Sequence, residues 1–338
     1  MRKIAASSGS ISLLSLAVAL GLALAPVHKA EAKEKTFALI EKGLMDPYGA
    51  KMKTGCDKAA AERGDTCVYI GPSQADDSAQ VQIFKDELTK GVDGIALAAR
   101  NPKSMARFIA GVHDLKIPLI TTDSDLLPQD AKLRTTFVGT DNYQFGATLA
   151  RQVMAMKPKG GTVCIQSGTP GALNLDTRVQ GVRDTLAGVD RDHPASRLTG
   201  QNGWTEPAGC PLYNMDDINT AAQQLNDTIT AHPDLDALIA VGGWAQYAPT
   251  AYRKAVGRVI DRIRSKAFVI AFGDAEAPQM PLLKDGLSHV NVGQNPFQIG
   301  YRTVRALQDL SDGKTVPPTI DTGFVVCKPE QADTCGKQ

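Results

Sequence analysis

The chain lacks clustered charge and the common catalytic motifs of α/β enzymes. It carries 37 Lys and Arg against 36 Asp and Glu, a net charge of +1, with no run of one sign. A polyanion-binding surface needs clustered basic residues, so we expect no nucleic acid partner. No G-x-x-x-x-G-K-[ST], G-x-G-x-x-G, H-E-x-x-H or G-x-S-x-G pattern occurs, and no Ser or Cys has a plausible base partner. We therefore expect neither enzyme activity nor a cofactor.

Histidine is also scarce. The five histidines are His28, His113, His193, His232 and His289. No two of them stand at the spacing of metal ligands, so the sequence predicts no metal site.

Long apolar segments are missing beyond the first 32 residues. A membrane-spanning helix needs about 20 apolar residues, and the apolar run over 11–25 is shorter. This run follows Arg2 and Lys3 and precedes Ala30-Glu31-Ala32, a pattern typical of a secretory signal peptide. We predict a periplasmic protein whose signal peptide, residues 1–32, is cleaved near Ala32. A membrane anchor is the alternative.

The six cysteines all follow the predicted signal peptide. An even number in an exported chain favours disulfides over thiol chemistry. Their clustering along the sequence predicts local pairs, namely Cys56 with Cys67, Cys164 with Cys210, and Cys327 with Cys335. The alternative, most open for the middle pair, is that the cysteines are free and buried as small hydrophobic residues.

Short apolar strands alternate with amphipathic helices along the rest of the chain. The first series predicts strands over 36–40, 66–70, 94–98 and 117–121, and helices over 48–63, 78–90 and 103–115. The second predicts strands over 162–166, 197–201, 237–241, 268–272 and 290–293, and helices over 143–156, 177–186, 216–232, 247–264 and 278–284. Such alternation indicates two α/β lobes, each a parallel sheet covered on both faces.

Polar and aromatic side chains gather where these strands end. In open parallel sheets, ligands bind outside the carboxyl ends of the strands. The candidate ligand-binding residues are Lys42, Asp46, Tyr48, Asp123, Asp125, Arg178, Trp204, Trp244, Asp274 and Gln294. Carboxylates, an arginine and aromatic faces suit a polyhydroxylated ligand. Each residue also has a simpler interpretation: the aspartates as turn or helix-cap residues, Lys42 as a solvated charge, and Trp244 as part of the core.

Several short motifs resemble those of periplasmic sugar-binding proteins of the ribose-binding and lactose-repressor-core type. They are Asp46-Pro47-Tyr48-Gly49, Gly91-Val92-Asp93-Gly94-Ile95, Ile117-Pro118-Leu119-Ile120-Thr121-Thr122-Asp123, Gly139-Thr140-Asp141-Asn142, Arg178 with Gly181, Phe272-Gly273-Asp274, and Gln294-Asn295-Pro296-Phe297-Gln298-Ile299-Gly300. The resemblance implies a type I periplasmic binding fold, with two Rossmann-like lobes and crossovers near 139–141, 294–295 and 321–323. The N-terminal lobe would hold 33–139 and 295–321, and the C-terminal lobe 140–294 and 322–338.

The same resemblance implies a function. Such a protein binds a monosaccharide or polyol between its lobes, closes around it and delivers it to the membrane permease of an ABC transporter, and we expect a monomer. The ligand positions would be Asp46, Tyr48, Asp123, Arg178, Asp274 and Gln294, with Trp204 at a position that is usually aromatic. Ser124 and Gly242-Gly243-Trp244 depart from the ribose-binding pattern. Lys42 and Asp123-Ser124-Asp125 leave a periplasmic receptor for a furanosyl quorum-sensing signal as the alternative.

Overall fold

The computed structural model describes residues 1, 3, 5–6, 33–44, 46–74, 76–112 and 115–336. The predicted signal peptide therefore lies almost wholly outside the described residues, and so does His113. Residues Glu34–Gln338 form one compact unit. Within the described ranges, no helix is both long and apolar enough to cross a membrane.

The first lobe is built on a six-stranded sheet in which every pair of neighbouring strands is parallel. The strand order is β12-β5-β4-β3-β1-β2. The strands are β1 (Thr36–Ile40), β2 (Thr66–Ile70), β3 (Gly94–Leu97), β4 (Leu119–Thr122), β5 (Phe137–Gly139) and β12 (Thr319–Asp321). The helices of this lobe are α1 (Pro47–Ala61), α2 (Asp77–Lys90), α3 (Pro102–Gly111) and α10 (Pro296–Ser311), with the short 3-10 helix η1 (Pro128–Leu133).

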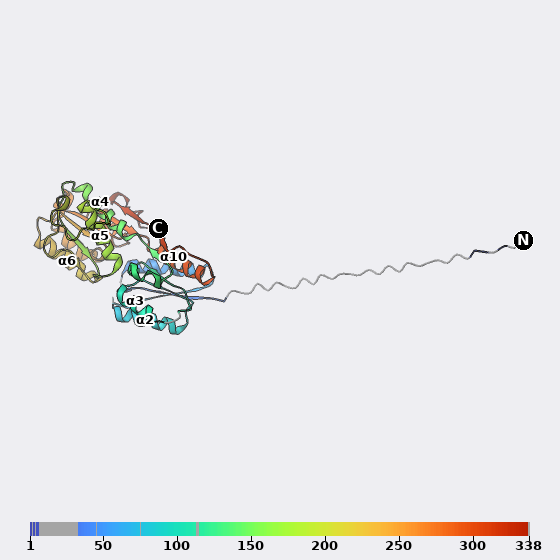
Figure 1. The fold of residues 1–338 in the computed structure, drawn as a ribbon. Helices are drawn as coiled ribbons and strands as arrows, with labels where there is room; N and C mark the ends of the chain where they lie inside the picture. Colours follow the sequence, from blue (N-terminus) through green and yellow to red (C-terminus); the bar gives the residue numbers. More distant parts are fainter. Residues whose placement is uncertain are drawn as a thin grey trace. The chain divides into compact units, whose positions relative to one another are not determined.

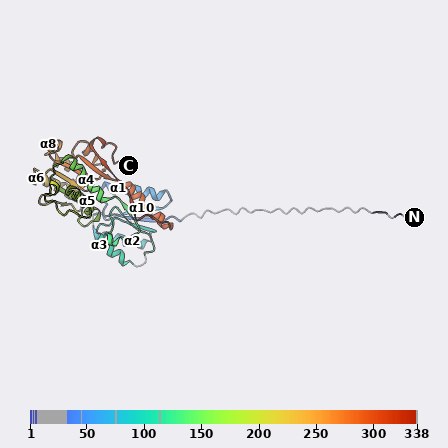
Figure 2. The same cartoon turned by 45° about the horizontal axis from the view of Figure 1, so that its top comes forward.

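Strand β1 shows how both faces of this sheet become buried. Phe37 and Leu39 pack with residues of α1 and α10, whereas Ala38 and Ile40 pack with residues of α2 and α3. Successive side chains of a strand point to opposite faces, so a continuous apolar strand requires a helix layer on each side. In Figures 1 and 2, α10 accordingly lies in the same lobe as α2 and α3, although it comes late in the sequence.

Helices α1 and α10 approach each other closely at two glycines. A Cβ atom on Gly55 would lie 2.0 Å from the carbonyl oxygen of Phe297, and one on Gly300 would lie 2.0 Å from that of Met52. No larger residue fits at either position without separating the helices. This contact attaches the late segment 296–311 to the first lobe.

The second lobe is built on a seven-stranded sheet, with order β13-β11-β10-β9-β6-β7 and β8 also paired to β6. Its strands are β6 (Gly161–Ser167), β7 (Trp204–Thr205), β8 (Leu212–Tyr213), β9 (Ala237–Ala240), β10 (Val269–Gly273), β11 (Val290–Gln294) and β13 (Phe324–Cys327). Its helices are α4 (Asn142–Met156), α5 (Leu173–Ala187), α6 (Ile218–Ala231), α7 (Pro249–Gly257), α8 (Ile260–Arg264) and α9 (Met280–Lys284), with 3-10 helices η2 (Gln201–Gly203), η3 (Trp244–Tyr247) and η4 (Pro329–Gln331). Only β13 runs antiparallel to its neighbour within this described sheet.

The chain passes between the two sheets three times. It leaves the first sheet after β5, returns after β11 through α10 to β12, and enters the second sheet again at β13. This architecture, two α/β lobes joined by three passages of the chain, is the fold class that the sequence predicted. The residue limits predicted for the lobes stay a prediction.

The strand predicted over 197–201 is wrong. Its place at the sheet edge is taken by β7, and Thr199 makes only an isolated bridge to Thr205. Gly200 turns the chain with a φ of 126°, and the Leu198 N–H donates to the Glu206 carboxylate instead of to a strand. The alternating apolar and polar residues of this segment therefore form a tight loop and not a strand.

The helix predicted over 247–264 is divided into α7 and α8. Val259, between them, has φ −122° and ψ 21°, which are not helical values. Gly257 and the β-branched Val259 are weak helix formers, and they coincide at the break. Helix α5 begins at Leu173, before the predicted start at residue 177, and β5, β7, β8, β12, β13 and α10 were not predicted.

The three predicted disulfide pairs are confirmed as close cysteine pairs. The Cα–Cα distances are 5.9 Å for Cys56–Cys67, 5.4 Å for Cys164–Cys210 and 5.8 Å for Cys327–Cys335. These distances lie within the usual range for a disulfide. The first pair joins α1 to β2, the second joins β6 to the loop before β8, and the third closes a loop after β13.

Candidate functional site

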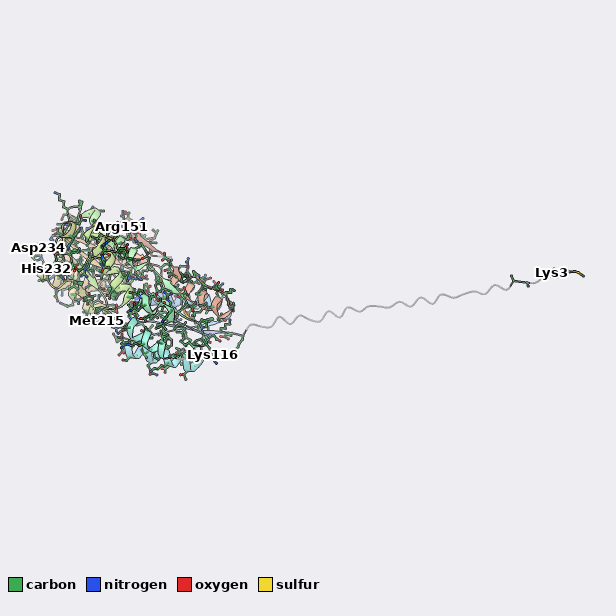
Figure 3. The ribbon with its side chains drawn as sticks, viewed as in Figure 1. Lys3, Lys116, Arg151, Met215, His232 and Asp234 are labelled. Atoms are coloured by element: carbon green, nitrogen blue, oxygen red, sulfur yellow. A yellow bond between two sulfur atoms is a disulfide. The ribbon has the colours of Figure 1, made fainter. Side chains whose placement is uncertain are left out.

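The carboxyl ends of strands from both sheets meet around one cavity of about 520 Å³. The residues that line it are Glu41, Lys42, Gly43, Asp46, Tyr48, Gly49, Gln74, Asp123, Asn174, Leu175, Arg178, Met215, Asp216, Asp217, Ile218, Asn219, Gly242, Trp244, Tyr247, Ala248, Asp274 and Gln294. Its volume is that of a small-molecule site. Met215, labelled in Figure 3, is half exposed and marks the rim.

Eight of the ten predicted ligand-binding residues line this cavity: Lys42, Asp46, Tyr48, Asp123, Arg178, Trp244, Asp274 and Gln294. They come from the ends of β1, β4, β9, β10 and β11 and from helices α1 and α5. The residues that the strand-end rule selected are far apart in the sequence, yet they lie around one cavity. Their part in ligand binding remains a prediction.

The other two predicted residues lie elsewhere. Trp204 begins β7, is 1% exposed and packs in the core of the second lobe. Asp125 binds Arg134, with Oδ2 2.6 Å from Nη2, and accepts a hydrogen bond from the Thr121 hydroxyl. Neither residue lines the cavity, because Trp204 is needed in the hydrophobic core and Asp125 has turned toward η1.

Asp123 is the centre of the polar contacts in the first lobe. One carboxylate oxygen lies 2.7 Å from Lys42 Nζ, and the other accepts a hydrogen bond of 2.8 Å from the Tyr48 hydroxyl. Burial by itself would raise the pKa of Asp123, but the charges of Lys42 and Arg178 bring it below its usual range. The carboxylate is therefore ionised and held in place for further donors.

Lys42 is correspondingly held in its charged form. Burial opposes the charge, but Asp123 and Asp216 outweigh it and raise the pKa of Lys42 above its ordinary value. The interpretation of Lys42 as a solvated surface charge is wrong, since the side chain is only 17% exposed.

Asp46 has two roles in the structure. Its Oδ1 atom accepts a hydrogen bond of 2.9 Å from the Gly49 N–H, which caps α1, and Pro47 occupies the first turn of that helix. The same side chain also lines the cavity. Burial raises the pKa of Asp46 to about 6, although the bond from Gly49 opposes the shift.

Asp274 anchors the second lobe. Its carboxylate accepts hydrogen bonds from the Gly243 N–H at 2.9 Å, the Tyr247 hydroxyl at 3.1 Å and Gln294 Nε2 at 2.9 Å. Its φ of 66° lies in the left-handed region, which Asp tolerates better than most residues. Gln294 Oε1 lies 3.4 Å from the oxygen of the Tyr48 hydroxyl, whose proton is directed to Asp123. A chain of polar contacts thus joins Asp123 of the first lobe to Asp274 of the second.

Arg178 supplies a donor whose capacity is only partly used. The side chain is 2% exposed, its Nε donates to Asn142 Oδ1 and its Nη1 to the Val241 carbonyl oxygen. The guanidinium also lies 4.4 Å from the ring centre of Phe145. Nη2 and the nearby Asn174 Oδ1 are buried without a hydrogen-bond partner among the described residues. Such groups call for a ligand or water in the cavity.

Trp244 and Tyr247 are aromatic residues of the cavity wall, as is Tyr48. A Cβ on Gly242 would lie 2.6 Å from the Trp244 ring, and one on Gly243 would lie 2.7 Å from the Tyr247 hydroxyl. The two glycines therefore leave room for these rings. Trp244 also packs in the core of the second lobe, so both of its interpretations hold.

Several lining residues were not predicted. Glu41 directly precedes Lys42 at the end of β1, and Tyr247 follows Trp244 within η3, so the same strand-end rule could have found both. Asp216 does not directly follow a predicted strand, so the strand-end rule would not have found it. It lies in a loop with φ 66°, and only folding of the second lobe brings it to the cavity.

We expect Glu41 to make the stability of the protein depend on pH. Burial and the neighbouring Asp123 raise the pKa of Glu41 from 4.5 to about 8. Between these values the folded chain holds a proton that the unfolded chain has lost, so the free energy of unfolding falls as pH rises. Each pKa unit is worth about 1.4 kcal/mol. In urea titrations at pH values from 5 to 9, the free energy of unfolding of Glu41→Gln should rise by more than about 1 kcal/mol relative to that of the native chain.

The matched control is Glu330→Gln, which alters an exposed carboxylate. We expect its unfolding free energy to follow that of the native chain across the same range. If Glu41→Gln also followed the native chain, the buried carboxyl of Glu41 would not be protonated at neutral pH.

Comparisons with known proteins agree with this architecture. A family model described as periplasmic binding protein domain matches residues 37–315. The chain is 24% identical over 297 residues to the D-ribose/D-allose-binding protein of Pseudomonas aeruginosa, with 85% of each chain covered. It is 23% identical over 295 residues to the ribose import binding protein of Bacillus subtilis, with 87% of this chain and 88% of that protein covered.

A solved structure shows the same fold. It is an ABC transporter solute-binding protein of Burkholderia graminis in complex with D-arabinose, with a TM-score of 0.77, 27% identity, and coverage of 90% of this chain and 99% of that chain. The family match contains every residue that lines the cavity. The chain therefore belongs to the periplasmic binding protein family, and its two lobes have the type I fold predicted from the sequence motifs.

Proposed function

We propose that this protein binds a monosaccharide or polyol between its lobes and delivers it to the permease of an ABC transporter. The cavity at the strand ends supports this proposal most directly. Ionised carboxylates accept from hydroxyl groups, Arg178 donates in a fixed geometry, and the aromatic wall covers C–H groups. The relatives named for ribose and allose, and the neighbour that holds D-arabinose, support the same class of ligand.

The proposed mechanism is hinge closure. A ligand shifts a conformational equilibrium only as far as its affinity for the two states differs. Groups from both lobes face the cavity, and contacts such as Asn174 Nδ2 to Asp123 Oδ2 at 3.4 Å already cross it. A ligand bound to Asp123 and Arg178 together would favour the closed state. No bond is made or broken, and we propose no enzyme activity.

Further features of the proposal concern location and partners. We propose that the chain is exported, cleaved near Ala32 and active as a periplasmic monomer whose macromolecular partner is the permease and not nucleic acid. The family is extracytoplasmic by description, which supports export. The alternative of a furanosyl-signal receptor is not favoured, since the relatives carry the names of sugar-binding proteins.

The test is calorimetric titration of the mature protein with pentoses, hexoses and polyols, combined with small-angle scattering. We expect at least one compound to bind and to reduce the radius of gyration at saturation, since closure brings the lobes together. A ligand at 100 to 1,000 times its Kd would also add about 3 to 4 kcal/mol to the unfolding free energy.

Absence of binding throughout the panel would contradict a sugar-binding role. Binding with an unchanged radius of gyration would leave the ligand class intact but contradict closure. Consumption of the ligand in the same samples would indicate an enzyme.

A further inference from the structure

The cavity holds more acidic than basic side chains. Six carboxyl groups line it, those of Glu41, Asp46, Asp123, Asp216, Asp217 and Asp274, whereas the only basic residues in the lining are Lys42 and Arg178. Lys42 is already engaged with Asp123. A cleft lined predominantly by one sign of charge attracts ligands of the other sign.

Most of these carboxyl groups form no ion pair, although the charge of Lys42, acting from a longer distance, partly offsets the burial that raises the pKa of Glu41 and Asp46. Among the described residues, Asp123 is the only one of the six with a Lys or Arg nitrogen within 4.0 Å. Asp274 is held by neutral donors alone. A buried carboxylate without a positive partner is unfavourable, so this lining favours a ligand group that carries positive charge.

Glu41 provides a second and independent indication that the ligand carries a positive charge. Its side chain is 4% exposed and lines the cavity, and its Oε1 atom is buried without a hydrogen-bond partner among the described residues. The neighbouring Asp123 and Asp46 act with burial to raise its pKa. Burial, together with the weaker repulsion from these carboxylates, thus keeps a proton on Glu41, which a positive ligand group would replace.

We propose that the native ligand is a polyhydroxylated compound that carries a protonated amine, such as an amino sugar or an amino polyol. This inference rests on the proposed function and narrows its ligand class. The ammonium group binds near Glu41 and Asp46 in the first lobe. The hydroxyl groups bind Asp123, Asp274 and the free Nη2 of Arg178. A neutral sugar would satisfy the second set of groups but offer no cation to the first, so Glu41 would keep its proton.

The experiment compares matched pairs of compounds by calorimetry on the mature protein. The amines are D-glucosamine, D-galactosamine, D-mannosamine and 1-amino-1-deoxy-D-glucitol, and each is paired with its neutral parent. We expect at least one amine to bind more than about tenfold tighter than its parent, with an affinity that falls as salt is added. Its binding should release protons, seen as an enthalpy that changes with the ionisation enthalpy of the buffer.

The possible outcomes separate the two proposals. Neutral parents that bind as tightly as their amines, or more tightly, would overturn the amine inference and leave the sugar-binding function standing. If no compound of either kind bound, the amine inference would fail, and the wider panel of pentoses, hexoses and polyols would decide the sugar-binding function.

Variants that each replace one carboxyl group by an amide test where the amine of the ligand binds. Asp46→Asn keeps a good helix cap, and Glu41→Gln keeps the shape of the side chain. We expect each to reduce the preference for the amine over its parent by about fivefold or more, an effect of the size reached by close charge pairs. Asp57→Asn, on the exposed face of α1, changes the net charge equally far from the cavity and should leave the preference unchanged. An equal loss in Asp57→Asn would indicate an effect of net charge and overturn the proposed location.

Discussion

Replacement of Asp274 by alanine is expected to weaken ligand binding by about 2 to 5 kcal/mol, because a desolvated charged acceptor disappears from the site. Three donors that now point at this carboxylate, from Gly243, Tyr247 and Gln294, would also lose their acceptor. Gln294 and Tyr247 would then be free to move, so part of the loss comes from disorder of the cavity wall. Calorimetry with the ligand found in the panel measures the effect.

The control for Asp274→Ala is Asp285→Ala in the same lobe. Asp285 is half exposed and pairs with Arg253 at the surface, where such pairs contribute little. We expect unchanged affinity for this control and a folded protein in both cases, checked by circular dichroism. An affinity of Asp274→Ala equal to that of the native chain would remove Asp274 from the binding site.

Loss of the Cys164–Cys210 disulfide is expected to cause the largest loss of stability among the three. Its partners are 46 residues apart, and a cross-link that closes a loop of this length stabilises by about 4 kcal/mol in the chain-entropy model. Cys327 and Cys335 are only 8 residues apart, for which the same model gives about 2.5 kcal/mol. We expect the Cys164→Ala/Cys210→Ala protein to unfold at lower urea concentration than the Cys327→Ala/Cys335→Ala protein.

Thiol labelling of the unfolded, unreduced native chain provides the control for this comparison. We expect no labelled cysteine if all three bonds form. Labelling of Cys164 or Cys210, or equal urea midpoints for the two double variants, would contradict the predicted order.

The sequence by itself predicted the elements whose signals are local. Strand β1 is a continuous apolar segment, and α1 begins with Asp46 as its cap and Pro47 in its first turn, so both follow from neighbouring residues. The predictions failed where local signals were weak. Strands β5 and β12 have three residues each, too few for a periodic pattern. They form by pairing with neighbouring strands, β5 with β4 and β12 with β5 at the edge of the sheet.

The strand-end rule also located most of the candidate site. Asp123 and Asp274 directly follow apolar strands, and parallel strands bring their carboxyl ends to one edge. The sequence alone could not distinguish Asp123 from Asp125. The two lie on one turn, yet Asp123 binds Lys42 in the cavity and Asp125 binds Arg134 outside it.

The choice between the two tryptophans was likewise made by the tertiary structure. Both follow predicted strands, but Trp204 fills the core beside β6, whereas Trp244 reaches the cavity over Gly242. The sequence determined the two-lobe plan, the cysteine pairs and the chemical character of the site, because these depend on residue type and local order. Only the tertiary structure decided which side chains face the cavity and which carboxylates lack a cation, since both depend on contacts between segments far apart in the chain.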